Sequence, residues 1–463
     1  MNRFSLVDKI LKKESEDWIN YLHGQKLNSL EHLKRETPKY TSIFLHTLSF
    51  FVYLFRLFIR ALKSKKSKKS KIEFYIYAGT FNEANSLVST AKALLKKNKV
   101  VLANSSNKHI LSSINKVFEF EQLDVGVSDV ILAIVLFIYK APILYFRLKK
   151  KDKLLVDNFF NSFCQSYIYL PIFCRLLNDY QPDFVLVSND HNVDCRSILA
   201  VAYKLGIKTV YMQHASVSEI FPALTVNYAF LDGESALNIY LKCEKNISDF
   251  YENRTLPKIF LSGQKKILNQ SSIHCASKVG LAINSLDNIV KVINLVNELV
   301  TEGFLVSLRW HPGQKESDIA LIKESFRHFS MVTLSDPRQE SIGNYLANLY
   351  CLISGNSSIH LEAAVASVAP IYYEIECQYF DDYYGFEKNN LVYKVNNLKD
   401  LLNSIRKENI FQPDPLAVKY YSATYNTEWY MREGELVATI LVDIKKSKSF
   451  TNMFGAKSYV PIK

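Results

Sequence analysis

Two short segments carry the side chains best suited to bind an anionic ligand. The first reads Leu-Arg-Trp-His-Pro and places Arg309 and His311 at the end of the apolar run 304–308. The second begins at Ser354, reads Ser-Gly-Asn-Ser-Ser, and follows the apolar run 349–353. Hydroxyls, basic groups and the first N–H groups of a helix are typical phosphate ligands. We therefore expect a phosphate site built from Arg309, His311, Ser354, Asn356, Ser357 and Ser358.

Each of these segments also has an ordinary structural interpretation. Ser-Ser before a helix is a common cap, with Asn356 or Ser357 at the N-cap position, and His-Pro commonly ends a strand. Their occurrence at two strand ends favours the functional interpretation, because strand ends of an open parallel sheet point into one ligand crevice.

Titratable side chains also follow three strands in the first half of the chain. Asp190 and His191 follow the run 184–188, His214 follows 207–212, and Asp232 ends a strand in 227–234. Imidazole, with an ordinary pKa near 6.5, suits a base near neutral pH, and a neighbouring carboxylate can orient it. We rank His191 with Asp190 first, His214 second and Asp232 third. The structural alternatives are that Asp190 caps the next helix and that His214 is a buried histidine.

The motifs for bound metals and dinucleotides are missing from the sequence. No HxxxH, HxH or DxD pattern occurs, so we expect no metal site. The first strand-to-helix turn, Gly79-Thr80-Phe81-Asn82-Glu83, lacks GxGxxG and is interpreted as a plain turn. We expect no cofactor.

Strands and helices alternate from residue 72 onward, which predicts a doubly wound α/β fold in two Rossmann-like halves. In the first half, we expect strands at 72–78, 99–103, 184–188, 207–212 and 227–234, with helices at 84–97 and 193–205. In the second half, we expect strands at 278–283, 304–309, 330–334, 349–354 and 369–374, with helices between them. The expected domains are 1–71 (helical, membrane-associating), 72–255 (acceptor), 256–415 (nucleotide donor) and 416–463 (helical segment and tail).

The N-terminal region has the composition of a membrane-surface anchor. Residues 43–62 are aromatic-rich, but Arg56 and Arg60 interrupt them, so they are too short for a clean span of about 20 apolar residues. Six lysines follow within 63–71, and each would favour anionic lipid by roughly 1 kcal/mol. We expect residues 43–62 to form an interfacial helix and the lysine run to contact lipid, with a solvated linker as the alternative for the lysine run. A second apolar run, 130–148, is interpreted equally as a buried helix or a further membrane-facing patch.

Composition and charge limit the class of protein. The 463 residues are 48% hydrophobic with 13% aromatics, which indicates a folded chain of two domains. The net charge of +12 is concentrated in the lysine-rich runs, and no base-reading motif accompanies them, so nucleic acid is not an expected partner. Seven scattered cysteines without a CxxC pair favour a reducing cytoplasm, and the charged first 40 residues indicate no cleavable signal peptide.

Arg309-Trp-His311-Pro312 resembles the HP motif of bacterial sialyltransferases, polysialyltransferases and related capsule enzymes. Ser354-Gly-Asn-Ser357-Ser358 resembles their serine motif, and Glu362 resembles the ribose-holding glutamate of GT-B enzymes. Asn189-Asp190-His191 and Tyr211-Met-Gln213-His214 resemble acceptor-side loops of bacterial surface-polysaccharide transferases. Leu231 stands where the sialyltransferases carry the first acid of an acidic pair before glycine.

This resemblance covers about 72–446. It implies a GT-B glycosyltransferase of capsule or lipopolysaccharide assembly, inverting and metal-independent, at the inner face of the cell membrane. Its partners would be a nucleotide-activated sugar, such as a CMP-activated nonulosonate or Kdo-type sugar, and a glycan or lipid-linked glycan acceptor. The alternatives are a CDP-polyol phosphate transferase, a nucleotide-sugar 2-epimerase and a non-catalytic partner in polysaccharide assembly.

Overall fold

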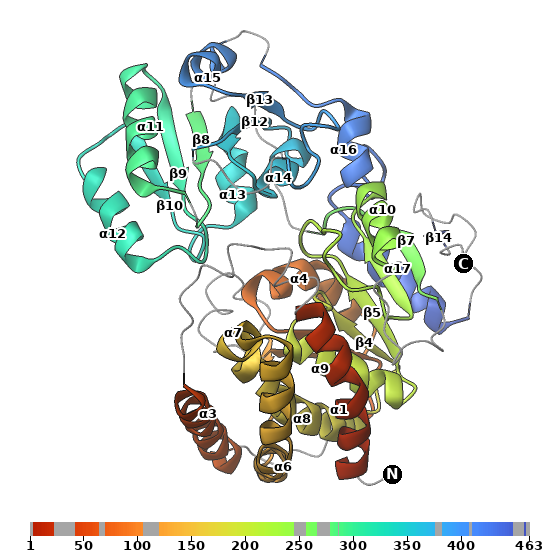
Figure 1. The fold of residues 1–463 in the computed structure, drawn as a ribbon. Helices are drawn as coiled ribbons and strands as arrows, with labels where there is room; N and C mark the ends of the chain where they lie inside the picture. The colour runs from red at the N-terminus through yellow and green to blue at the C-terminus, as the bar shows by residue number, and fades with distance from the viewer. Residues whose placement is uncertain are drawn as a thin grey trace.

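The structure is a computed structural model, and it describes residues 3–22, 42–63, 70–104, 120–244, 256–265, 278–285, 287–375, 382–406, 410–447 and 458–459. Two mainly parallel sheets, each covered by helices, form two Rossmann-like halves (Figure 1). This α/β, GT-B-like architecture is the fold expected from the sequence. Most of the lysine run 63–71 lies outside the described residues.

The first sheet has the order β14-β7-β6-β5-β4-β1-β2-β3, parallel except for β14. Its strands are nearly continuous apolar runs because helices cover both faces. Their bounds are β1 Phe74–Ala78, β2 Val100–Asn104, β3 Glu121–Gln122, β4 Phe184–Val187, β5 Lys208–Met212, β6 Tyr228–Leu231, β7 Lys258–Leu261 and β14 Ser458–Tyr459.

The second sheet is parallel throughout, with the order β10-β9-β8-β11-β12-β13. Its strands are β8 Lys278–Ala282, β9 Leu305–Arg309, β10 Val332–Ser335, β11 Cys351–Ser354, β12 Ala369–Tyr373 and β13 Tyr393–Val395. Its helices are α11 Ile289–Thr301, α12 Glu316–Ser325, α13 Ile342–Ala347, α14 Ile359–Val365 and α15 Leu398–Ile405. Strand β8 pairs in parallel with both β9 and β11. The carboxyl ends of β9 and β11 therefore lie at the same edge of the sheet, on either side of β8.

The first half extends beyond the expected boundary at residue 255. Strand β7, which the sequence did not indicate, pairs in parallel with β6, and β14 adds to β7. Helix α17 Glu433–Lys445 packs on α4 Phe81–Leu95 of the first half and contributes Leu436, Ile440 and Leu441 to its core. Helices α9 Val193–Lys204 and α10 Glu234–Cys243 also belong to this half, and α16 Pro415–Tyr421 contacts both α10 and α14 of the second half.

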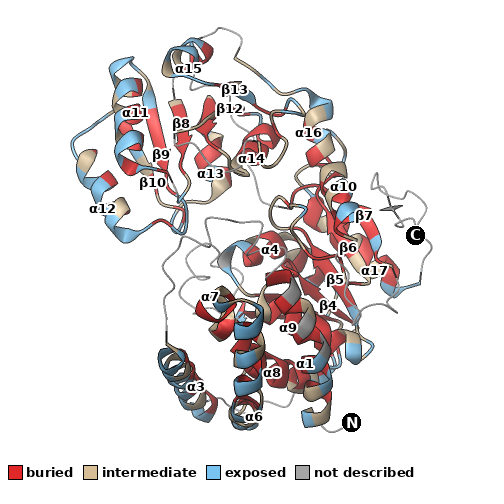
Figure 2. Cartoon of the chain, in the orientation of Figure 1, coloured by how far each residue is buried: buried red, intermediate tan, exposed pale blue. Residues whose placement is uncertain are grey.

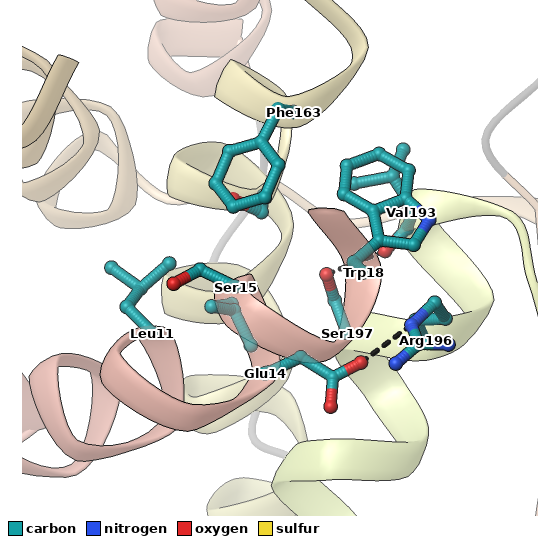
Figure 3. A pocket seen from close by; sticks show the side chains of 10 residues that line it. Leu11, Glu14, Ser15, Trp18, Phe163, Val193, Arg196 and Ser197 are labelled. Atoms are coloured by element: carbon teal, nitrogen blue, oxygen red, sulfur yellow. Dashed lines mark hydrogen bonds and ion pairs between the residues drawn. The ribbon is translucent and has the colours of Figure 1, made fainter. Parts of the chain in front are cut away.

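The N-terminal helix α1 Arg3–Asn20 also belongs to the first half, packed on α8 Ser166–Tyr180 and on α9. Arg196 Nε donates to Glu14 Oε1 at 2.6 Å, and Arg196 also pairs with Asp17. Beside this ion pair lies a cavity of about 20 Å³ between Trp18, Phe163 and neighbouring side chains (Figure 3). It has room for about one water molecule, so we interpret it as a packing gap rather than a ligand site.

Three further helices extend this helical layer away from the sheet. Helix α3 Ile43–Lys63 packs on α6 Val127–Lys151, and α7 Lys153–Cys164 follows α6 (Figure 1). In the described residues, α3 and α6 are the two helices long and apolar enough to cross a membrane, by length and composition alone.

Candidate functional site

A cavity of about 450 Å³ lies between the two halves. Such a volume falls within the usual range for small-molecule sites, roughly 300 to 1,000 Å³. From the second half, the cavity is lined by Ala282, Ile283, Arg309, Trp310, His311, Pro312, Pro337, Glu340, Ser341, Ile342, Asn344, Ser357, Ser358, Ile359 and Glu362. From the first half, it is lined by Asn82, Asn85, Val88, His214 and Ala215. Residues singled out in both halves therefore face one space.

Arg309 is held in a fixed position in the cavity wall. Its Nη1 donates to Ser335 Oγ at 2.7 Å, and its Nη2 donates to the carbonyl oxygen of Glu340 at 3.1 Å. The guanidinium also lies 5.2 Å from the ring centroid of Tyr345. Burial lowers the pKa of Arg309, yet a guanidinium stays protonated at neutral pH. The guanidinium is therefore held at the cavity wall in a fixed conformation, and the Glu340 carboxylate, with Oε2 4.0 Å from Arg309 Nη1, offsets part of its positive charge.

His311 is set up to donate a hydrogen bond. Its Nδ1 accepts from the N–H of Gly313 at 3.0 Å, so in the neutral ring the proton lies on Nε2. Partial desolvation lowers the pKa of His311, which favours this neutral form at pH 7. The Nε2–H group is suited to donate to a phosphate oxygen.

The serine-rich turn after β11 faces the same cavity through Ser357 and Ser358. Helix α14 begins at Ile359, one or two residues later than expected, and Ser358 at its cap position makes no side-chain cap bond. His360 Nε2 donates to the carbonyl oxygen of Gly355 at 2.9 Å and so stabilises the turn. Complete burial lowers the pKa of His360 to about 4, so this ring is neutral at pH 7.

Two predicted donor ligands lie outside the cavity lining. Ser354 Oγ donates to the carbonyl oxygen of Ala282 at 2.7 Å and links β11 to β8. The carbonyl oxygen of Asn356 accepts from Asn284 Nδ2 at 3.3 Å, which braces the turn. Both residues therefore position the turn, and Ser357, Ser358 and Glu362 line the cavity itself.

On the opposite wall, His214 is the one base candidate that lines this cavity. Its Nδ1 donates to the carbonyl oxygen of Ser188, at the end of the adjacent strand β4. In the neutral ring, Nε2 is then the basic nitrogen. Asn82 and Asn85 of α4 lie on the same wall, and the sequence did not single them out as site residues.

Asp190 and His191 form a hydrogen-bonded pair outside this cavity lining. His191 Nδ1 lies 3.0 Å from Asp190 Oδ1, and Asn189 Oδ1 accepts from the N–H of His191 at 2.9 Å, which fixes the turn. The His191 ring packs against Phe221 at 4.8 Å between centroids. The structure thus contains the expected pair, but neither residue lines the cavity that holds the donor-side residues.

Asp232 lies in a buried ion pair. Its Oδ1 accepts from Lys265 Nζ at 2.7 Å, and Lys265 also donates to Ser262 Oγ and to the carbonyl oxygen of Gly263. The Lys265 side chain is fully buried and that of Asp232 is 5% exposed. This pair joins the ends of β6 and β7, which indicates a structural role rather than contact with an acceptor.

Two buried carboxylates, Glu83 and Asp194, lie near the end of β1. Glu83 Oε2 accepts from the N–H of Gly79 at 2.7 Å, and Tyr77 Oη donates to Asp194 Oδ2 at 2.7 Å. Burial and, secondarily, Asp194 raise the pKa of Glu83. A Cβ at Gly79 would lie 2.3 Å from Asp194 Oδ2, so glycine is required there by close packing.

In the described ranges, no group of three or more His, Cys, Asp or Glu side chains is arranged to hold a metal ion.

Comparisons with known proteins identify the fold. No protein-family model and no curated protein matches the chain. A structure of S. aureus MnaA with UDP matches at a TM-score of 0.54 and 11% identity, covering 83% of this chain and 99% of that one. A putative UDP-N-acetylglucosamine 2-epimerase from Listeria monocytogenes matches at 0.52 and 11%, covering 82% and 98%. Another UDP-N-acetylglucosamine 2-epimerase matches at 0.51 and 13%, covering 83% and 100%. The chain therefore shares the two-domain GT-B-like fold of nucleotide-sugar enzymes.

Proposed function

We propose that this protein is a glycosyltransferase that moves a sugar from a nucleotide donor to a growing surface glycan. The observation that carries the proposal is the cavity between the halves, where Arg309, His311, Ser357 and Ser358 lie on one wall and His214 on the other. Nucleotide phosphate is the anion best matched to the first wall. Glu362 of the same wall is proposed to bind the donor ribose, as its resemblance to GT-B enzymes implies.

The chemistry needs a base on one side of the sugar and charge stabilisation on the other. His214 Nε2 would remove the proton from an acceptor hydroxyl while that oxygen attacks the anomeric carbon of the donor. The bond from sugar to phosphate breaks, and Arg309, His311 and the two serine hydroxyls stabilise the charge on the departing nucleotide. Attack from the face opposite the leaving group inverts the anomeric configuration. We propose that these groups stabilise the phosphate without a metal ion.

The donor-side residues give a binding prediction. We expect His311→Ala, Ser357→Ala and Ser358→Ala each to weaken nucleotide affinity by about 1 to 3 kcal/mol, because each loses a hydrogen bond to a charged group. Calorimetry with free nucleotide measures this change. Ser317→Ala, an exposed serine of α12 outside the cavity lining, is the matched control and should bind nearly as wild type. Unchanged affinity in all three test variants would contradict the donor-side assignment.

A nucleotide-sugar 2-epimerase is the second candidate, favoured by the structures reported above. An epimerase converts the nucleotide-sugar itself and needs no acceptor. Helices α3 and α6 expose many large apolar side chains, which favours the transferase, because a lipid-linked acceptor would be presented at a membrane. The proposed location is accordingly the cytoplasmic face of the cell membrane, in capsule or lipopolysaccharide assembly.

Product analysis with CMP-, UDP-, GDP- and CDP-activated donors distinguishes the candidates. We expect nucleotide release that depends on a glycan acceptor, with a CMP-activated nonulosonate or Kdo-type sugar as the first donor to test. Acceptor-independent formation of an isomeric sugar would instead identify an epimerase. Transfer of a polyol phosphate from a CDP donor would identify a polyol phosphate transferase. Binding without turnover of any donor would identify a non-catalytic assembly partner.

A further inference from the structure

Helices α3 and α6 leave many large apolar side chains uncovered on the first half. More than half of the large apolar side chains that are exposed in the described residues lie on these two helices. On α3 they are Ile43, Phe44, Leu45, Leu48, Phe51, Val52, Phe55, Ile59 and Leu62, and on α6 they are Ile131, Ile138, Tyr139, Ile143 and Phe146. Figure 2 shows exposed residues along both helices. Soluble proteins seldom leave an apolar surface of this kind without a partner.

The two helices present this surface as one unit. The rings of Phe50 and Phe137 stack with centroids 4.2 Å apart, and Arg60 donates to the carbonyl oxygen of Leu123, just before α6 begins. These two contacts fix an antiparallel pair. Each helix buries one stripe and exposes the opposite one. The buried stripe of α3 contains His46, Phe50, Leu54, Leu57 and Ala61, and that of α6 contains Val130, Ala133, Phe137, Leu144 and Leu148. One side of the helix pair is therefore buried against the first half, and the other side exposes apolar side chains.

Ion pairs hold α6 in the first half. Asp129 is buried between Arg3 of α1 and Arg175 of α8, each 2.8 Å from it. Lys140 pairs with Asp8 of α1 at 2.5 Å. Crossing a bilayer would break these contacts and expose charged groups to hydrocarbon, at a cost of several kcal/mol. This packing favours α6 lying along a membrane surface over spanning it.

The charge around the apolar surface is basic. Arg56 and Lys63 are exposed on α3, and Lys149, Lys150 and Lys151 end α6. Because the helices are antiparallel, Lys63 and the three lysines of α6 lie at opposite ends of the pair. Helix α3 contains no acidic residue, and the one acid of α6, Asp129, is buried. An apolar face with basic ends matches a bilayer of anionic lipids, whose headgroups meet the lysines while the apolar side chains enter the acyl boundary.

We propose that α3 and α6 together form the docking surface for an anionic membrane. The surface extends the expected anchor, residues 43–62, by a second helix that belongs to the folded half. Docking would place the first half against the bilayer, where a lipid-linked acceptor reaches it. This last step rests on the proposed transferase function, but membrane docking itself does not.

Vesicle flotation of the full chain tests the proposal. We expect the protein to float with phosphatidylglycerol-containing vesicles and far less with phosphatidylcholine alone. The double variant Phe55→Glu/Phe146→Glu should lose flotation, because both side chains, 65% and 68% exposed, lie on the proposed surface. The matched control is Val290→Glu/Leu416→Glu, at positions 60% and 74% exposed on other elements, and it should float as wild type. Lys149→Ala and Lys150→Ala should each weaken binding about fivefold.

Several results would overturn the proposal. Wild-type protein that does not float, or a test variant that floats as well as the control, excludes this surface as the membrane contact. A wild-type dimer that the test variant dissociates would instead assign the surface to a second copy of the chain. Flotation needs no nucleotide, and calorimetry with nucleotide needs no vesicle. Failure of membrane docking is therefore distinguishable from failure of the proposed enzyme function.

Discussion

Replacing His214 with alanine is expected to lower turnover by a factor of about 100 to 10,000, the usual loss when a general base is removed. His214 lines the cavity opposite the donor-side residues, and its Nδ1 hydrogen bond to Ser188 leaves Nε2 as the basic nitrogen. Nucleotide affinity should change little, because the proposed phosphate ligands lie on the other wall. Steady-state turnover and calorimetry on the same protein preparation separate the two effects.

His191→Ala is the matched control for this measurement. His191 belongs to the same edge of the first sheet and pairs with Asp190, but it does not line the cavity. We expect it to retain much more activity than His214→Ala, and added imidazole should partly restore turnover to the His214 variant alone. Near-wild-type turnover in His214→Ala, with a large loss in His191→Ala, would return the base to the Asp190–His191 pair.

Asp232→Ala is expected to destabilise the fold by about 3 to 5 kcal/mol, because it leaves the charge of Lys265 buried without its carboxylate. Urea unfolding measures this loss. The double variant Asp232→Leu/Lys265→Met removes both charges and should recover most of the stability, since apolar pairs often replace buried ion pairs at little cost. Lys242→Ala breaks an exposed pair with Glu219 and should leave stability unchanged.

The turnover of the double variant also distinguishes a structural role of Asp232 from a catalytic one. If the carboxylate were the base, the double variant would fold stably and have no turnover. If it is structural, activity in the double variant should follow the fraction of folded protein. A stable Asp232→Ala protein without activity would contradict the structural assignment.

Alternation of apolar runs with amphipathic segments was sufficient to predict the two parallel sheets. Strand β7 was missed because its four residues follow a highly charged stretch and local sequence gave no sign that they pair with β6. Helix α17 packs on α4, which lies more than 300 residues earlier in the chain. The apolar residues of α17 predict that one face is buried, but they do not show which half of the protein covers that face. The local sequence pattern was enough to predict the fold class. It was not enough to predict which half of the protein a terminal segment joins.

The candidate site was predicted in part for similar reasons. The rule that parallel strand ends share one edge brings Arg309, His311 and Ser357 together in the second sheet and places His214 at the corresponding edge of the first. The rule does not show that these two edges face one cavity. Side-chain direction at a strand end depends on the turn that follows, so the sequence could not show that Ser354 bonds to Ala282. Asn82 and Asn85 lie in the first turns of α4, where their spacing of three on one helix face was the available signal.

A crystal structure with the nucleotide that binds most tightly would test the central claim most directly. We expect phosphate oxygens within hydrogen-bond distance of His311 Nε2 and of the Ser357 or Ser358 hydroxyl, with the sugar-bearing end directed towards His214. Nucleotide bound anywhere outside the cavity between the two halves would contradict it.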